Sequence, residues 1–156
     1  MNRNKVLSVV IVLVLVVCLF VVARLKTVNT PSSIQKQLTF TSGATIQLEI
    51  AETVEQQELG LSGRTSLKEG QGLWFPLAEE NEQGMWMKDM LFPIDVFWFD
   101  KNMVVVDIKK DISPSTYPEI FYPVSDSLYV LEISAGAAEK MKIKVGDTAS
   151  LVEIGG

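Results

Sequence analysis

The sequence contains no histidine and only one cysteine among its 156 residues. Because histidine is a common general base and metal ligand, its absence excludes Ser-His-Asp triads and histidine-ligated zinc or iron. Cys18 lies in an apolar N-terminal run, so the rest of the chain cannot form an internal disulfide, a Cys₄ zinc site or an iron–sulfur cluster. Any site must therefore be built from Arg, Lys, carboxylates and aromatic residues, and we expect no metal ion and no cofactor.

Basic residues are scarce beyond the N-terminal region. Four of the 14 Lys and Arg residues (Arg3, Lys5, Arg24 and Lys26) flank the apolar run, whereas all 19 acidic residues follow position 36. Residues 36–156 thus hold ten basic residues and 19 acidic ones, a formal charge of −9. Binding to a phosphate backbone needs clustered Lys and Arg, so we do not expect nucleic acid as a partner.

Residues 6–23 contain no charged side chain. As a helix they would span roughly 27 Å, close to the thickness of a thin bilayer core. We therefore expect residues 1–26 to form a single-pass membrane anchor. A signal peptide cleaved after Ala23 is the alternative, because Val21 and Ala23 are the small residues that such a site prefers. The very short N-terminal tail favours a cell-membrane protein whose domain faces outside the cytoplasm.

Residues 27–36 are rich in Ser, Thr and Asn and are predicted to form a flexible tether. From residue 37 to 154, alternating polarity and turn residues indicate seven or eight short strands. A capping-box spacing predicts a helix over 54–59, and a second helix is expected from Ser134 to about Met141. The expected fold is α+β and mostly β. It has an antiparallel or mixed sheet, partly closed like a barrel, and two short helices.

Five stretches of this domain carry a family resemblance. They are Gly60-Leu-Ser-Gly-Arg64 with Leu67, Gly72-Leu-Trp-Phe75, the run from Met85 through Trp-Met-Lys to Pro93 and Asp95, Tyr129-Val-Leu-Glu132 leading into Ala135-Gly136, and Ile143-Lys-Val-Gly-Asp147. In this order they resemble the DUF192 family, also called UPF0127, over about residues 46–151. The resemblance implies a small, mostly β domain, often behind a signal sequence or membrane segment, and it implies no established reaction.

The central stretch places charges among large apolar residues. If residues 84–89 form a strand, Met85, Met87 and Asp89 share one face while Trp86 and Lys88 share the other. A charge on an aromatic face must be solvated, paired or stacked.

We therefore consider a concave site in which Lys88, with Arg64, holds an anionic group beside Trp86. The candidate ligand-binding residues are Arg64, Trp86, Lys88, Asp89, Asp95 and Glu132. The plainer interpretation is a structural Lys88–Asp95 ion pair on an ordinary sheet.

Two functional hypotheses follow from these residues. The first is a membrane-tethered extracytoplasmic domain that binds a small molecule, glycan or protein partner without catalysis. The alternative is a hydrolase of an envelope glycan that uses Asp95 and Glu132, because glycoside hydrolysis needs two carboxylates in different environments. A purely structural or assembly domain is a weaker third hypothesis.

Overall fold

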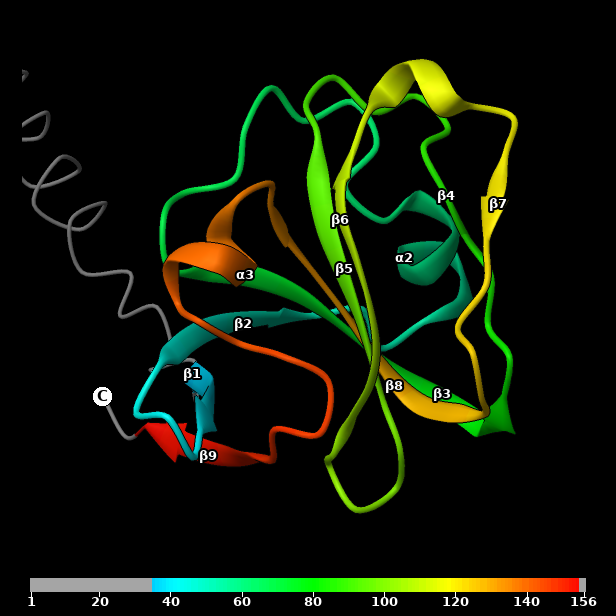
Figure 1. Ribbon diagram of the computed structural model, residues 1–156. Coiled ribbons are helices and arrows are strands. Elements are labelled where there is room, and N and C mark those ends of the chain that lie inside the picture. The colour runs from blue at the N-terminus through cyan, green and yellow to red at the C-terminus, as the bar shows by residue number, and fades with distance from the viewer. Residues whose placement is uncertain (1–34, 155–156) are drawn as a thin grey trace, which may run out of the picture. The chain divides into compact units, whose positions relative to one another are not determined.

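A computed structural model describes residues 35–154, which form a mixed β-sheet with short helices at its sides (Figure 1). The main sheet contains β1 (Gln35–Phe40), β2 (Thr45–Ile50), β3 (Gln71–Asn81), β5 (Ile94–Phe99), β6 (Val105–Ile112), β8 (Ser127–Ser134) and β9 (Ala149–Ile154). A separate small sheet pairs β4 (Met85–Trp86) with β7 (Ile120–Phe121). The helices are α2 (Val54–Leu59), α3 (Ala137–Lys140) and the 3₁₀ turn η1 (Pro114–Thr116).

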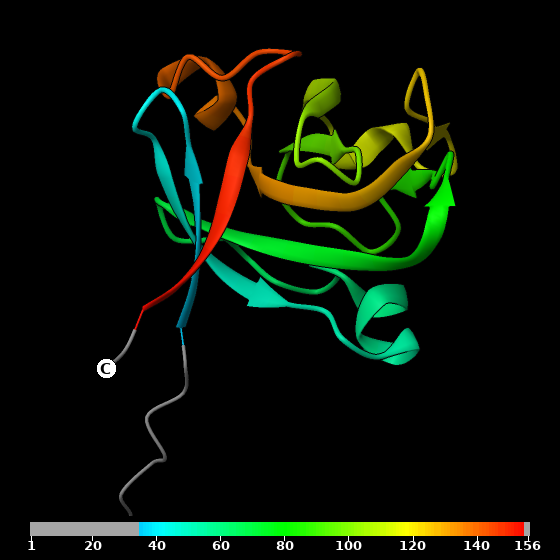
Figure 2. The ribbon, with the colours of Figure 1, turned by 90° about the horizontal axis from the view of Figure 1, so that it is seen from below.

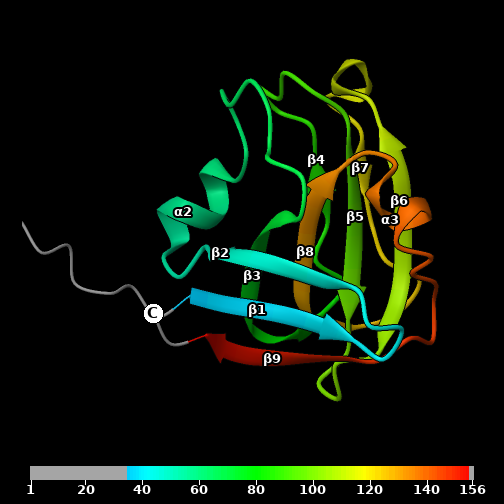
Figure 3. The same ribbon diagram turned by 90° about the vertical axis from the view of Figure 1, so that its left-hand side faces the viewer.

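The seven strands follow the order β6-β5-β8-β3-β2-β1-β9, which can be traced across the sheet in Figure 3. The β2–β3 pair is parallel, whereas the other neighbouring pairs are antiparallel. The predicted mostly β, mixed sheet with two short helices is therefore confirmed. The sheet does not close into a barrel, because β6 and β9 remain its two ends. One isolated bridge, Val104 to Thr148, links the segments that lead into these end strands.

The strands of the main sheet differ in length and curvature. In Figure 2, β3 (green) and β8 (orange) run beside each other as two long curved strands. Their register shifts between Pro76 and Asn81. Residues of β3 beyond Pro76 therefore turn away from the regular ladder, toward the small β4–β7 sheet, and a bulge of this kind bends a strand.

Local signals predicted α2 well and α3 less well. The Thr53 hydroxyl accepts a hydrogen bond from the Gln56 amide at 3.2 Å, while the Gln56 side-chain carbonyl accepts one from the Thr53 amide at 3.0 Å. This capping box starts α2 where the sequence predicted it. Ser134, in contrast, does not cap α3, because its backbone pairs with Ile94 in the sheet. The helix begins after Gly136 instead.

Side chains alternate along the central strands and fill two cores, one on each face of the sheet. One core is built around Phe40, Trp74, Phe97, Phe99, Leu131 and Ile133, and the other around Leu73, Phe75, Val96, Trp98 and Val130. All six residues of β5 are buried for this reason. Asp95 on β5 and Glu132 on β8 are therefore enclosed, and each needs a partner or a pocket.

The N-terminal predictions fall largely outside the described residues. The predicted membrane span over residues 6–23 lies there, as does most of the predicted tether. Within residues 35–154, no helix is long and apolar enough to cross a membrane. The predicted tether ends too late, because Lys36 already pairs with Leu48 and Glu153 inside the sheet.

Candidate functional site

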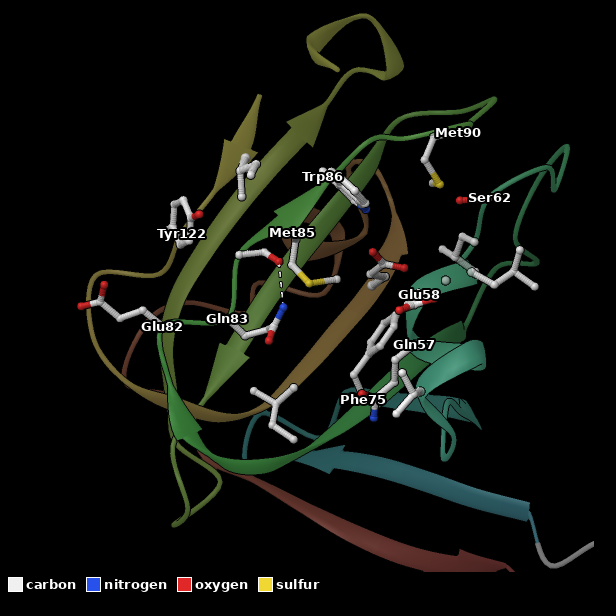
Figure 4. A pocket seen from close by; sticks show the side chains of 18 residues that line it. Gln57, Glu58, Ser62, Phe75, Glu82, Gln83, Met85, Trp86, Met90 and Tyr122 are labelled. Carbon is white, nitrogen blue, oxygen red and sulfur yellow. Dashed lines mark hydrogen bonds between the residues drawn. The ribbon is translucent and has the colours of Figure 1, made fainter. Parts of the chain in front are cut away.

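A pocket of about 510 Å³ opens between α2, the far half of β3 and the small β4–β7 sheet (Figure 4). Its lining comprises Val54, Gln57, Glu58, Leu59, Gly60, Leu61, Ser62, Phe75, Leu77, Glu82, Gln83, Gly84, Met85, Trp86, Met90, Ile120, Tyr122 and Glu132. In the close-up view, Gln57, Glu58 and Phe75 lie on one side, with Met85 and Trp86 across from them. Glu82 and Tyr122 lie toward the opposite end.

Glu132 on β8 is the buried polar group of this pocket. Its neighbours across the sheet are Leu73 on β3 and Val96 on β5, so its carboxyl group emerges from an apolar face. The residue is 4% exposed, and its Oε2 atom has no hydrogen-bond partner among the described residues. Burial raises the pKa of Glu132 to about 8, against a smaller lowering by the positive charge of Arg64. The carboxyl group is therefore mostly protonated at neutral pH and has an open hydrogen-bonding position.

The turn after α2 brings the backbone close to this carboxyl group. Gly60 has φ +52° and ψ −132°, a conformation in which a side chain would be strained. A Cβ atom at this position would lie 3.7 Å from Glu132 Oε2 and 3.8 Å from Phe75 Cζ. The glycine thus lets the chain reverse beside Glu132, and the turn forms part of the pocket wall.

The mouth of the pocket is apolar, although it faces solvent. Five of its side chains are 44–67% exposed, namely Val54, Leu59, Trp86, Ile120 and Tyr122. Contiguous apolar residues around an opening are typical of binding sites. Among the described residues that line the pocket, the charged ones are Glu58, Glu82 and Glu132, and none is Lys or Arg.

Trp86 and Lys88 lie close to each other, but only Trp86 lines the pocket. The Lys88 ammonium group lies 5.6 Å from the centre of the Trp86 ring, and the Tyr117 ring packs against the same indole with centroids 5.9 Å apart. The predicted strand ends early, since β4 stops at Trp86. Asp89 has a left-handed φ of +56°, and its carbonyl accepts a hydrogen bond from the Gly63 amide. The alternation of faces therefore does not extend to Asp89.

Arg64 is occupied by another partner. Its guanidinium group donates to both carboxylate oxygens of Glu49, at 2.6 and 2.7 Å. This pairing lowers the pKa of Glu49. Arg64 lies near enough to Glu132 to influence its titration, yet it does not line the pocket. The predicted anion site made by Arg64 and Lys88 beside Trp86 is thus not assembled.

Asp95 has a structural role away from the pocket. It pairs with Ile133, the neighbour of Glu132 on β8, so Asp95 and Glu132 point to opposite faces of the sheet. Its two carboxylate oxygens accept hydrogen bonds from the backbone amides of Asp111, at 2.8 Å, and Ala138, at 2.9 Å. Lys88 forms no ion pair with it in the described part of the chain. The proposed Lys88–Asp95 pair and the Asp95–Glu132 catalytic pair are both corrected by this geometry.

Sequence reasoning missed most of the pocket walls. Glu58 was noted only as part of a predicted helix, and Gly60 and Phe75 only within the stretches that carry the family resemblance. Only the helical spacing of Val54, Gln57 and Glu58, which places them near one another on α2, was visible as a signal. Across residues 35–154, no group of three or more His, Cys, Asp or Glu side chains is arranged to hold a metal ion.

The fold and the pocket together define a small, mostly β domain with an acidic, apolar-walled pocket. The chain belongs to the DUF192 family, described as "Uncharacterized ACR", which matches residues 37–151. No curated protein matches the sequence.

Two solved structures are similar to the chain. A protein of unknown function from Novosphingobium aromaticivorans has 27% sequence identity and a TM-score of 0.69, covering 80% of this chain and 91% of its own. A protein from Sinorhizobium meliloti, described as a candidate transcription regulator, has 26% identity and a TM-score of 0.68, covering 77% and 92%. These likenesses support the fold and the family, and they assign no reaction.

Proposed function

We propose that this domain binds a small, largely apolar molecule in the pocket beside α2, without catalysing a reaction. The observation that carries the proposal is Glu132, a buried carboxyl group that lines an open pocket and whose Oε2 atom has no hydrogen-bond partner within residues 35–154. An unsatisfied buried polar group destabilises a folded protein, typically by about 1–3 kcal/mol. A ligand that supplies the missing hydrogen bond would remove this penalty.

The dimensions and lining of the pocket support a small-molecule ligand. Its volume of about 510 Å³ falls in the range of roughly 300–1,000 Å³ that small-molecule sites occupy. Apolar and aromatic side chains dominate the walls, and a few polar groups would fix the orientation of the ligand. An anionic ligand is disfavoured, because Arg64 is bound to Glu49 and Lys88 lies outside the lining.

We also propose that residues 6–23 anchor the chain in the cell membrane and that the domain faces outside the cytoplasm. The apolar run flanked by Arg3, Lys5, Arg24 and Lys26 supports the anchor. The charge of −9 over residues 36–156 supports a partner other than nucleic acid. We expect a reporter that works only outside the cytoplasm to be active when it is fused after Gly156. Activity only of a reporter that works inside the cytoplasm would contradict the orientation.

A thermal-shift screen of the full-length chain in a mild detergent tests the binding proposal. Small amphipathic molecules should raise the melting temperature of the wild type and have much less effect on Glu132→Gln. At a free concentration 100 times Kd, binding adds about 2.7 kcal/mol to stability. Glu79→Gln is the matched control, because Glu79 is exposed and lies outside the pocket. Equal shifts in all three proteins would contradict the role of Glu132.

Hydrolysis is a second candidate function, and one observation favours it. Glu58 and Glu132 line the same pocket in different environments, with Glu132 buried and protonated and Glu58 on the exposed helix α2. Two carboxyl groups of this kind can act as proton donor and base in glycoside cleavage. The test is the release of phenol from aryl glycosides. Release by the wild type that both Glu58→Gln and Glu132→Gln abolish would favour hydrolysis over simple binding.

A further inference from the structure

We infer that the ligand carries a protonated amine, and that its ammonium group binds the carboxyl group of Glu132 inside the pocket. This inference rests on the proposed binding function and adds the chemical class of the ligand. It follows from the charges around the pocket, from its aromatic walls and from the open position on Glu132.

The charge distribution around the pocket favours a cation. Every charged residue of the lining is a glutamate, with Glu58 and Glu82 near the exposed rim and Glu132 buried. The positive charge of Arg64 acts on Glu132, and two hydrogen bonds hold the Arg64 guanidinium group to Glu49. The sheet neighbours of Glu132, Leu73 and Val96, are apolar. A cation entering the pocket therefore meets three carboxyl groups and no competing ammonium or guanidinium group in the lining.

The aromatic walls suit an ammonium group as well. Phe75, Trp86 and Tyr122 all line the pocket, and aromatic faces attract cations within about 6 Å of the ring centre. Trp86 already shows this behaviour, because the Lys88 ammonium group lies 5.6 Å from its ring centre. Since Lys88 does not line the pocket, it leaves the interior free for a ligand.

Glu132 can complete the interaction by giving up its proton. The ammonium group offers three hydrogen-bond donors, and Glu132 Oε2 has no hydrogen-bond partner among the described residues. As the ligand enters, the O–H bond of Glu132 breaks, its proton passes to the solvent, and an N–H···O hydrogen bond forms to the resulting carboxylate. Because burial raises the pKa of free Glu132 to about 8, the group is mostly protonated at pH 7. Binding there should release close to one proton per ligand.

Titration calorimetry with three probes of identical apolar body tests the inference on the full-length chain in detergent. The probes are 3-phenylpropylamine, 3-phenylpropanol and 3-phenylpropanoate. The amine should bind most tightly and, in buffers of different ionisation enthalpy, should release close to one proton at pH 7. Its Kd should fall about tenfold between pH 6 and pH 7 and level off above pH 8, because one proton leaves Glu132 on binding.

Variants separate Glu132 from general charge effects. Glu132→Gln, which is nearly isosteric, should weaken amine binding by about tenfold or more and abolish the proton release. Glu58→Gln at the rim should weaken binding only a few fold, and the exposed control Glu79→Gln, outside the lining, should leave it unchanged. The pH dependence of the wild type provides a readout that requires no variant to fold.

The outcomes distinguish this inference from the proposed function. Tighter binding of the alcohol or the acid than of the amine would overturn the inference and leave small-molecule binding intact. Amine binding without proton release would also overturn it. If no probe, and no compound of the thermal-shift screen, binds the wild type more tightly than Glu132→Gln, the proposed function fails along with it.

Discussion

Asp95 and Glu132 lie on neighbouring strands of the sheet but point to opposite faces. Asp95 pairs with Ile133, while Glu132 pairs with Val96. The two buried acids therefore have different roles. The carboxylate of Asp95 accepts two backbone hydrogen bonds and joins β5 to β6 and α3. Glu132 instead lines the pocket, and its Oε2 atom finds no partner in the part of the chain that the structure describes.

The role of Asp95 predicts a loss of stability on Asp95→Asn. The amide that replaces one oxygen cannot accept a hydrogen bond, so either the Asp111 or the Ala138 amide loses its acceptor. Hydrogen bonds to charged groups contribute about 1.5–3 kcal/mol each, and we expect a destabilisation of this size in urea unfolding. Asp126→Asn, at an exposed position, should change stability by less than about 0.5 kcal/mol. Equal effects of the two substitutions would contradict the structural role.

The raised pKa of Glu132 predicts that the free energy of unfolding declines as the pH rises. Its pKa is about 8 in the folded chain and near the ordinary value of 4.5 when unfolded. Between these values the folded state holds one more proton than the unfolded state. Its contribution to the free energy of unfolding is therefore fully present below pH 4.5 and falls by about 1.4 kcal/mol per pH unit until pH 8.

Glu132→Gln is the comparison that isolates this effect. The neutral amide does not titrate, so the difference in unfolding free energy between variant and wild type should increase in favour of the variant from pH 5 to pH 8. Urea unfolding at several pH values measures it. A difference that stays constant over this range would show that Glu132 has an ordinary pKa.

The charge of Arg64 predicts a shift in the same titration. Arg64 lowers the pKa of Glu132, so Arg64→Leu should raise it and extend the decline of stability to higher pH. Glu49→Gln is the matched control, because it breaks the same ion pair and keeps the positive charge. This pair is partly exposed, so we expect its loss alone to change stability by less than about 1 kcal/mol. Identical pH profiles of the two variants would contradict an effect of Arg64 on Glu132.

The close packing around Gly84 predicts that a side chain at this position disturbs the mouth of the pocket. A Cβ atom there would lie 2.5 Å from Ile120 Cγ2 and 2.7 Å from Tyr122 Cε1, so Gly84→Ala must displace these side chains of the rim. We expect about 1–3 kcal/mol of destabilisation and weaker binding of the amine probe. Gly72→Ala crowds Leu131 and Ile46 in the opposite core, and should destabilise the chain without changing the Kd of the folded protein. Unchanged binding in Gly84→Ala would show that the rim does not contact the ligand.

Local sequence signals predicted the elements whose stability is local. The capping box at Thr53 predicted α2 because its hydrogen bonds join residues three apart. Alternating polarity predicted short strands, and the antiparallel β1–β2 pair joins residues that are close in the sequence. Ser134 has the residue type of a helix cap, yet pairing with Ile94 keeps it in a strand, a contact between distant parts of the chain.

The candidate site was predictable only in part. Trp86, Lys88 and Glu132 were chosen because charges and aromatic rings lay close in sequence or in a family motif. Which face Glu132 and Asp95 occupy depends on the register between β5 and β8, which no single strand reveals. The pocket also needs α2 and β7, whose positions follow from long-range packing.

The ¹³C resonance of the Glu132 carboxyl carbon tests the central claim most directly. Followed by NMR against pH in the full-length chain, it should titrate near pH 8 in the free protein. With saturating 3-phenylpropylamine it should remain that of a carboxylate at pH 7 and below. An ordinary titration near 4.5 in the free protein, or a resonance that saturating amine leaves unchanged, would contradict the account.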